Sequence, residues 1–343
     1  SVSYSSNNNN LTDNTVNSNR CGIFLLEANN NSLINNNALS NQFGISLNNS
    51  SNNTLMNNTA SNNYYVYDIM NEGVGIMVGD RSSNNSVINN TVSNNTWGIW
   101  VWSRCNNNTL TNNDVSNNRL GIRLEESGNN TLTNNTFVND GLIVYESYDN
   151  TVQGNTVNGK PLAYLEDVAD QTITNAGQVI LVNCDNITAE NLNLSNSDVG
   201  VEFWGTNNST IKNINSSNNY VGIYLEESNS NILMNITASN TWSGIYLENS
   251  SNNMLTNITA SSVLTALREL ELFYSNEYSH NNIVENLTIS SYPTTISFTY
   301  DNGIAIASVT IPEPDPVGKG NIGKYVDVEG LTNRSWIFLN VSY

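Results

Sequence analysis

The stretch Gly44–Asn63, which reads GISLNNSSNNTLMNNTASNN, decides the fold because close copies of it recur along the chain. Copies begin at Gly121 (GIRLEESGNNTLTNNTFVND), Gly222 (GIYLEESNSNILMNITASNT) and Gly244 (GIYLENSSNNMLTNITASSV). Each unit is about 22 residues long and contains three short segments of alternating apolar residues separated by polar turns. Three short strands per unit predict an all-β chain that forms a right-handed parallel β-helix of about twelve coils.

One asparagine column runs through the repeats, and we expect it to form an internal ladder of amide hydrogen bonds between coils. The ladder positions are Asn35, Asn57, Asn89, Asn112, Asn134, Asn191, Asn213, Asn235 and Asn257. Two apolar columns predict the core, with Leu33, Leu55, Val87, Leu110, Leu132, Val152, Ile211 and Leu255 in one and Ile23, Ile45, Ile76, Ile99, Ile122, Ile223 and Ile245 in the other. Burial of each such side chain contributes about 1.5–3 kcal/mol, so the stack can hold a domain with a polar exterior.

The repeat predicts a β-helix over residues 1–290, with insertions near 64–73 and 158–173. Over residues 291–343, four longer strands, a DNG hairpin turn and a Pro-rich linker indicate a β-sandwich-like segment. Four strands are few for such a domain. We therefore expect a partner or further sequence to complete it.

Composition restricts the partners. The net charge is −19 and only 12% of the 343 residues are charged, which argues against nucleic acid and anionic membranes. The sequence has no run of about 18 apolar residues, so we expect no membrane span. The chain begins at Ser1 without an initiator Met, as expected for an exported protein that has lost its leader or for an internal piece.

The repeat, together with NGKPLAYLEDVADQTI from Asn158 and AGQVILVNCDNITAENLNLSN from Ala176, resembles the NosD/CASH family of right-handed β-helix proteins. The likeness is closer to large cell-surface proteins of methanogen-related archaea, which implies an extracellular location at the cell surface. The family name also implies periplasmic copper delivery. One His (His280), three Cys and five scattered Met make no cluster of soft ligands for Cu(I), so copper delivery ranks third among the functional hypotheses.

Cysteine and sequon positions follow the repeat. Cys105 and Cys184 fall in a column of small residues, coils apart, which predicts buried, inert thiols rather than a disulfide. Many N-x-S/T sequons suggest N-glycosylation of an exported protein. Most coincide with ladder positions such as Asn57, which we expect to point inward. The sequons outside the ladder, and therefore the expected glycosylation sites, are Asn193, Asn215, Asn333 and Asn340.

Glu226, Glu227 and Glu248 follow the G-I-x-L strand in adjacent coils. Parallel stacking places like charges about 4.8 Å apart, which a calcium ion with carboxylate ligands would relieve. A solvated acidic stripe is the alternative, and the sequence favours it. No other cofactor is expected, and the sequence shows no acid–base cluster of the kind that β-helix lyases and hydrolases use.

The outward column of the G-I-x-L strand is aromatic in several coils. An outward aromatic patch usually marks a contact surface, here for glycans or for another subunit. The column contains Phe24, Trp100, Tyr224 and Tyr246, and Trp97, Trp102 and Trp204 lie beside it. A loop folded over them is the alternative.

The preferred hypothesis is an extracellular structural protein of an archaeal cell surface. It would self-assemble into a layer, sheath or filament, as a homo-oligomer or polymer joined through its β-helix ends or its C-terminal β segment. The alternative is a carbohydrate-binding or polysaccharide-processing β-helix surface protein that uses the aromatic face. Binding of an acidic polysaccharide that is lost on Trp100→Ala would favour this alternative.

Overall fold

The computed structural model describes residues 5–64, 73–262, 273–275, 278–289, 294–301, 304–310, 325–330 and 336–341. The named elements in these ranges are all β-strands. They form two compact units, the first made of residues 1–164 and 196–198 and the second of residues 165–195 and 199–343. Within the described ranges, no helix has the length and apolarity that a membrane span requires.

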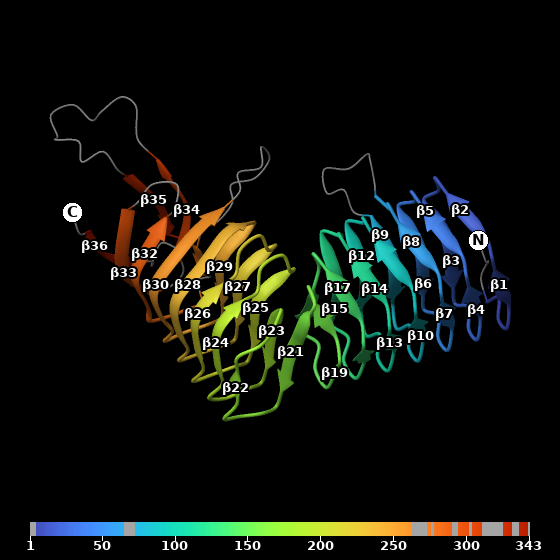
Figure 1. Cartoon of the computed structure of the whole chain (residues 1–343), viewed down its shortest axis with the longest axis horizontal. Coiled ribbons are helices and arrows are strands. Elements are labelled where there is room, and N and C mark those ends of the chain that lie inside the picture. Colours follow the sequence, from blue (N-terminus) through green and yellow to red (C-terminus); the bar gives the residue numbers. More distant parts are fainter. Residues whose placement is uncertain are drawn as a thin grey trace. The chain divides into compact units, whose positions relative to one another are not determined.

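Unit 1 is a right-handed parallel β-helix in which each coil contributes one strand to each of three sheets (Figure 1). Sheet A consists of β1 (Asn10–Thr12), β4 (Ser32–Ile34), β7 (Thr54–Met56), β10 (Ser86–Ile88), β13 (Thr109–Thr111), β16 (Thr131–Thr133) and β19 (Thr151–Gln153). Sheet B consists of β2 (Thr15–Asn17), β5 (Asn37–Leu39), β8 (Thr59–Ser61), β11 (Thr91–Ser93), β14 (Asp114–Ser116), β17 (Thr136–Val138), β20 (Thr156–Val157) and the antiparallel β21 (Lys160–Glu166). Sheet C consists of β3 (Cys21–Leu26), β6 (Phe43–Asn48), β9 (Val74–Gly79), β12 (Trp97–Trp102), β15 (Leu120–Glu125) and β18 (Leu142–Tyr145).

Unit 2 also consists of stacked coils, and its strands form two sheets instead of three. Sheet D consists of β23 (Gln178–Val182), β25 (Val199–Trp204), β27 (Val221–Glu226), β29 (Ser243–Glu248), β31 (Phe273–Ser275), β34 (Ile304–Thr310) and β35 (Tyr325–Gly330). Sheet E consists of β22 (Thr172–Ile173), β24 (Thr188–Asn193), β26 (Thr210–Asn215), β28 (Ile232–Thr241), β30 (Met254–Ser262), β32 (Asn282–Ile289), β33 (Thr294–Asp301) and β36 (Trp336–Val341). Over the described residues, the parallel β-helix has about 11 turns.

The predicted C-terminal segment and the two predicted insertions can each be compared with the structure. Strands β33 to β36, which fall in the proposed β-sandwich-like segment, join sheets D and E in antiparallel pairing. A separate sandwich therefore stays a prediction. The insertion near 64–73 lies almost entirely outside the described residues, and the one near 158–173 contains β21 and β22.

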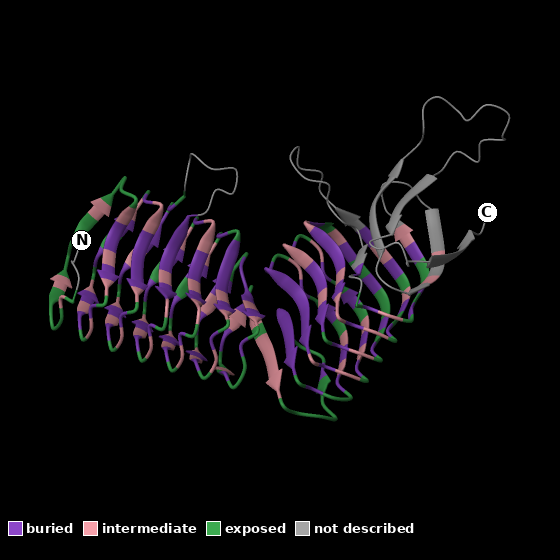
Figure 2. Ribbon diagram, turned by 180° about the vertical axis from the view of Figure 1, so that it is seen from behind, coloured by how far each residue is buried: buried purple, intermediate pink, exposed green. Residues whose placement is uncertain are grey.

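The two predicted apolar columns form the core. Leu55 and Ile45 are fully buried, and each is in register with its counterparts in the coils before and after. Figure 2 shows the result as buried strand positions inside the coils and exposed turns between them. Val152, near the end of sheet A, is the one member of these columns that is only half-buried.

The predicted asparagine ladder is one residue out of register in unit 1. Asn57 is exposed and adopts a left-handed φ of 56°, whereas the next residue, Asn58, is 1% exposed. The same holds for Asn35, Asn89, Asn112 and Asn134, which are exposed; the buried column is Asn36, Asn58, Asn90, Asn113, Asn135 and Asn155. Asparagine adopts the left-handed conformation more readily than most residues, so the first Asn of each N-N pair makes the corner and the second points inward.

Asn58 shows how a buried amide is fully satisfied. Its Oδ1 accepts from the backbone N and the Nδ2 of Asn36 at 2.9 and 3.0 Å. Its own N and Nδ2 donate to Asn90 Oδ1 at 2.9 and 3.0 Å, and Nδ2 also donates to Leu33 O at 2.9 Å. A buried amide without such partners would destabilise the fold, so each coil fixes the register of the next.

Unit 2 has apolar residues where unit 1 has this buried asparagine column. Leu192, Ile214, Ile236 and Ile258 follow the left-handed asparagines, and the strands of sheet E run through this position without a corner. The predicted ladder does exist in unit 2, but on the surface: Asn213, Asn235 and Asn257 each donate from Nδ2 to the Oδ1 of the preceding coil's residue at 2.9–3.0 Å, beginning at Asn191. The residue after the left-handed asparagine therefore distinguishes the two kinds of coil: it is asparagine in the three-sheet coils of unit 1 and leucine or isoleucine in the two-sheet coils of unit 2.

Candidate functional site

The outer face of sheet C carries three adjacent indoles. Ile99 and Val101 are buried in the core, so the alternation of β12 directs Trp100 and Trp102 outward. The rings of Trp97 and Trp100 meet edge-to-face with centroids 4.2 Å apart, and those of Trp100 and Trp102 stack at 5.1 Å. All three are partly exposed. We call Trp97, Trp100 and Trp102 the tryptophan platform.

Gly79 on the neighbouring β9 lets Trp102 lie close to the sheet. A Cβ atom at this position would collide with Trp102 Nε1, so a larger residue would displace the indole. The sequence pattern predicted the tryptophans as contact residues but gave no indication of a role for Gly79.

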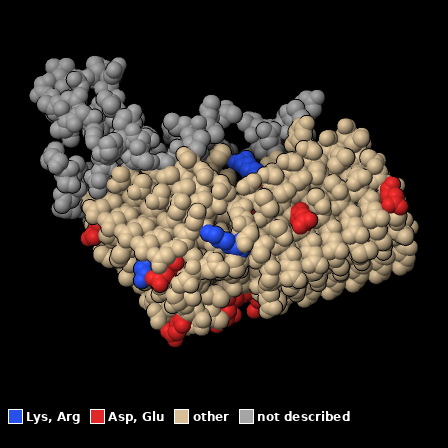
Figure 3. Space-filling view, in the orientation of Figure 1, with Lys and Arg blue, Asp and Glu red and all other residues tan. Residues whose placement is uncertain are grey.

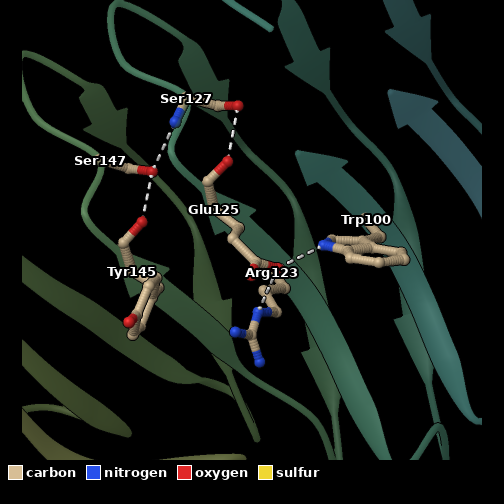
Figure 4. A network of polar contacts seen from close by, with 6 residues as sticks. All are labelled: Trp100, Arg123, Glu125, Ser127, Tyr145 and Ser147. Carbon is tan, nitrogen blue, oxygen red and sulfur yellow. Dashed lines mark hydrogen bonds and ion pairs between the residues drawn. The ribbon is translucent and has the colours of Figure 1, made fainter. Parts of the chain in front are cut away.

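An ion pair is fixed beside the platform (Figure 4). Glu125 Oε2 accepts a hydrogen bond from Trp100 Nε1 at 2.9 Å and lies 3.0 Å from Arg123 Nε. The Nε–H direction does not meet hydrogen-bond geometry, so the contact with Arg123 is electrostatic. The Arg123 guanidinium lies over the rings of Trp97 and Tyr145, with Cζ 5.6 and 5.5 Å from their centroids. Cation–π contacts of this kind stabilise a fixed guanidinium orientation.

Two serines fix the strand ends that carry Glu125 and Tyr145 (Figure 4). Ser127 Oγ donates to Glu125 O at 2.8 Å, and Ser147 Oγ donates to Tyr145 O at 2.9 Å. Ser147 Oγ also accepts from Ser127 N at 2.9 Å. Both serines belong to the small-residue column, so the repeat itself supports this part of the site.

The other predicted aromatic residues lie elsewhere. Phe24 shares a row with Trp100 across sheet C, but β6 and β9 separate them. On sheet D, the ring centroids of Tyr224 lie 5.9 Å from Trp204 and 5.4 Å from Tyr246. Trp204 is only 3% exposed and its Nε1 donates to Glu202 Oε1 at 2.9 Å, so the expectation that it forms a contact surface is wrong.

The structure brings together two of the three predicted calcium ligands. Tyr224 Oη donates to Glu226 Oε2 at 2.9 Å and lies 3.3 Å from Glu248 Oε2, while Asn249 Nδ2 donates to Glu226 Oε1 at 2.8 Å. Burial, and then the nearby Glu248 carboxylate, raise the pKa of Glu226 to about 7 against the hydrogen bond from Asn249. Glu227 takes a left-handed corner, with φ 49°, and is exposed, so its carboxylate is not part of this pair. Calcium binding stays a prediction.

The cysteines occupy structural positions in the coils. Cys105 Sγ accepts from Ser82 N at 3.2 Å and donates to Trp102 O at 3.0 Å, and burial raises its pKa to about 11. Cys184 Sγ lies 3.3 Å from Val182 O, and burial raises the pKa of this thiol too. Both are buried as predicted, and Cys21 is half-buried in another coil. A copper ion needs converging, deprotonated soft ligands, so these thiols do not fit one.

We predict that Cys105→Ser leaves the free energy of unfolding within about 1 kcal/mol of wild type, because Ser82 and Ser127 already use hydroxyls in the same column. Thermal unfolding measures the change, and thiol titration of the native protein should leave Cys105 and Cys184 unmodified. Rapid modification of both thiols without unfolding would contradict the structural role.

Sequon asparagines are exposed both at the selected positions and at the left-handed corners. Asn193 and Asn215 are exposed, as their selection requires. Asn333 lies outside the described residues, and the side chain of Asn340 on β36 is not described. However, Asn57 and its sequon counterparts are exposed as well, so the reason for discounting them was wrong. Glycosylation at any of these sites stays a prediction.

Charged side chains are few on the face in Figure 3, and uncharged residues cover most of that surface. This agrees with a composition in which 12% of residues are charged. Contacts made by individual groups such as Arg123 therefore matter more than a continuous charged surface.

Among solved structures, the chain is similar to the A-module of the mannuronan C-5 epimerase AlgE4 of Azotobacter vinelandii, at 12% identity over 82% of this chain and 84% of that one, with a TM-score of 0.38. It is also similar to the tailspike protein of E. coli bacteriophage HK620 in complex with a pentasaccharide, at 13% identity over 97% of this chain and 72% of that one, with a TM-score of 0.39.

The search of curated proteins gives no match. The model of the NosD family, described as periplasmic copper-binding protein, matches residues 1–120, 104–177 and 165–306. These segments span most of the chain and include all of unit 1 and unit 2 as far as residue 306. The chain therefore belongs to the NosD family.

Proposed function

We propose that the protein is an exported β-helix protein of the cell surface that binds a saccharide on the tryptophan platform. The observation that supports this most is the group of three mutually contacting, partly exposed indoles beside a fixed ion pair. Exposed indoles are costly in water, and sugar rings offer apolar C–H faces with hydroxyls at their edges. A flat aromatic surface next to oriented polar groups suits such a ligand.

The geometry favours binding over catalysis at this face. Glu125 is the carboxylate nearest the indoles in the described network, and its Oε2 already contacts both Trp100 Nε1 and Arg123 Nε. A general acid or base must exchange a proton with its substrate. Glu125 instead holds Trp100 and Arg123 in place.

Self-assembly into an archaeal surface layer, sheath or filament stays a prediction. Parallel β-helices support such assemblies through their sheet edges. Electron microscopy of the native material tests it, since a lattice or filament is expected and dispersed single particles would contradict it.

Trp100→Ala is predicted to weaken saccharide binding by about 30-fold or more, because Trp100 contacts both other indoles and central tryptophans dominate such interfaces at about 2 kcal/mol or more. Isothermal titration calorimetry of wild type and variant against a panel of oligosaccharides measures the change. Gly79→Val should also reduce affinity, since it displaces Trp102 without removing any indole.

Phe24→Ala is the matched control, because Phe24 lies in the same row but is separated from the platform by two strands. Its affinity should equal that of wild type. Equal affinity for Trp100→Ala and wild type, or no saccharide binding by wild type, would contradict the proposed function.

A further inference from the structure

Arg123 presents the free edge of its guanidinium group beside the tryptophan platform. Trp97 comes from β12 and Tyr145 from β18, the strands on either side of β15, so the guanidinium lies between two rings. The ion pair with Glu125 is made at Nε, which is buried, although the side chain as a whole is 23% exposed. Three contacts therefore fix this cation while its far end points elsewhere.

The terminal nitrogens of the Arg123 guanidinium keep N–H donors available for a ligand. Figure 4 shows the two terminal nitrogens of Arg123 directed away from Glu125 and Trp100. Within the described part of the chain, neither nitrogen donates a hydrogen bond. An arginine has five N–H donors in a rigid fork, and four of them are on these two nitrogens.

We propose that the saccharide bound on the tryptophan platform carries a carboxylate, as a uronic acid does, and that Arg123 is the residue that recognises it. This inference rests on the proposed function. A carboxylate is planar and accepts two parallel hydrogen bonds from the guanidinium edge. The rings of Trp97 and Tyr145 flank the guanidinium, so a planar acceptor approaches its open edge with less obstruction than a tetrahedral sulfate ester.

The charge of the chain determines the kind of recognition. A protein with a net charge of −19 does not attract polyanions over a long range. Acid recognition must therefore come from a short-range contact at a fixed group. Selectivity between an acidic sugar and its neutral form should persist at 0.5 M salt, where about 4 Å of screening length removes longer-range effects.

The test compares oligouronides with their methyl esters, which keep the ring and remove the charge. Oligomers of galacturonate, glucuronate and mannuronate serve as probes, with calorimetry on the full chain. Wild type should bind an acid at least tenfold more tightly than its ester. Arg123→Gln should bind both forms with the affinity of the ester, and Arg123→Lys should recover only part of the preference because it lacks the planar fork.

The outcomes separate the two proposals. Equal binding of acid and ester by wild type, or tighter binding of a sulfated neutral oligosaccharide, would overturn the carboxylate inference while leaving saccharide binding intact. An unchanged acid preference in Arg123→Gln would also overturn it, and thermal unfolding confirms that this variant is folded. Absence of any saccharide binding would overturn the proposed function itself.

Discussion

Asn58→Ala is expected to lower the free energy of unfolding of unit 1 by about 3–5 kcal/mol. The substitution removes the acceptor for two donors of Asn36 and the donor for Leu33 O, all in buried coils. Each buried polar group left without a partner costs about 1–3 kcal/mol. Chemical denaturation followed by circular dichroism measures the change.

Asn57→Ala is the matched control, since it changes the adjacent residue of the same N-N pair. Asn57 is exposed, so the expected cost is that of placing alanine at a φ of 56°, about 1–2 kcal/mol. A larger loss of unfolding free energy for Asn57→Ala than for Asn58→Ala would contradict this register. It would indicate that the column of Asn57, and not that of Asn58, forms the internal ladder of unit 1.

Asp140→Asn is expected to stabilise unit 1 at pH 8 and to remove about half of the fall in its stability between pH 4 and pH 8. Asp140 ends the column formed by Asn41, Asn63, Asn95 and Asn118, and Asn118 Nδ2 donates to its Oδ2 at 2.8 Å. Asparagine is therefore the residue that the rest of this column uses. The carboxyl group is fully buried.

A second buried carboxyl group, that of Asp198, increases the dependence of the stability of unit 1 on pH. Asp198 is 2% exposed and accepts from Gly121 N at 2.6 Å. Burial, and then the neighbouring Asp198, raise the pKa of Asp140 to about 8. Burial raises the pKa of Asp198 to about 7, against hydrogen bonds from the Gly121 and Gly141 amides. The folded protein therefore retains protons here that the unfolded chain releases above about pH 4.

The direction follows from proton linkage. Between pH 4 and pH 8 the folded state binds more protons than the unfolded state, so the free energy of unfolding falls as pH rises, by about 2–5 kcal/mol over this range. Unfolding curves at each pH unit measure the slope, with the exposed Asp114→Asn as control. Stability that rises from pH 4 to pH 8 in wild type, or a slope unchanged in Asp140→Asn, would contradict this account.

The repeat made most of the β-helix predictable, because residues at a constant spacing must stack. The apolar columns and the small-residue column with Cys105 and Cys184 were assigned this way and, apart from the half-buried Val152, are buried. The ladder register was missed because two adjacent asparagines look alike in sequence. The alternation of side chains along a strand could have identified the register. Ala60 points inward, so Asn58, two residues earlier, points inward as well.

The candidate site was predictable only in part. Trp97, Trp100 and Trp102 stand out as outward aromatics in one repeat, but Arg123 and Glu125 occupy the equivalent positions of the next coil with different chemistry. Their contacts depend on rotamers that periodicity does not give. Gly121 and Asp198 are 77 positions apart, and their contact depends on residues 196–198 joining unit 1 outside the repeat.

The central claim is that the outer face of sheet C binds a saccharide, and a crystal structure of the full chain with a bound oligouronide tests it most directly. We predict electron density for a sugar ring stacked on Trp100 and its neighbouring indoles, with its carboxylate at the terminal nitrogens of Arg123. Density confined to any other face of the protein, with the tryptophan platform empty at saturating ligand, would contradict the account.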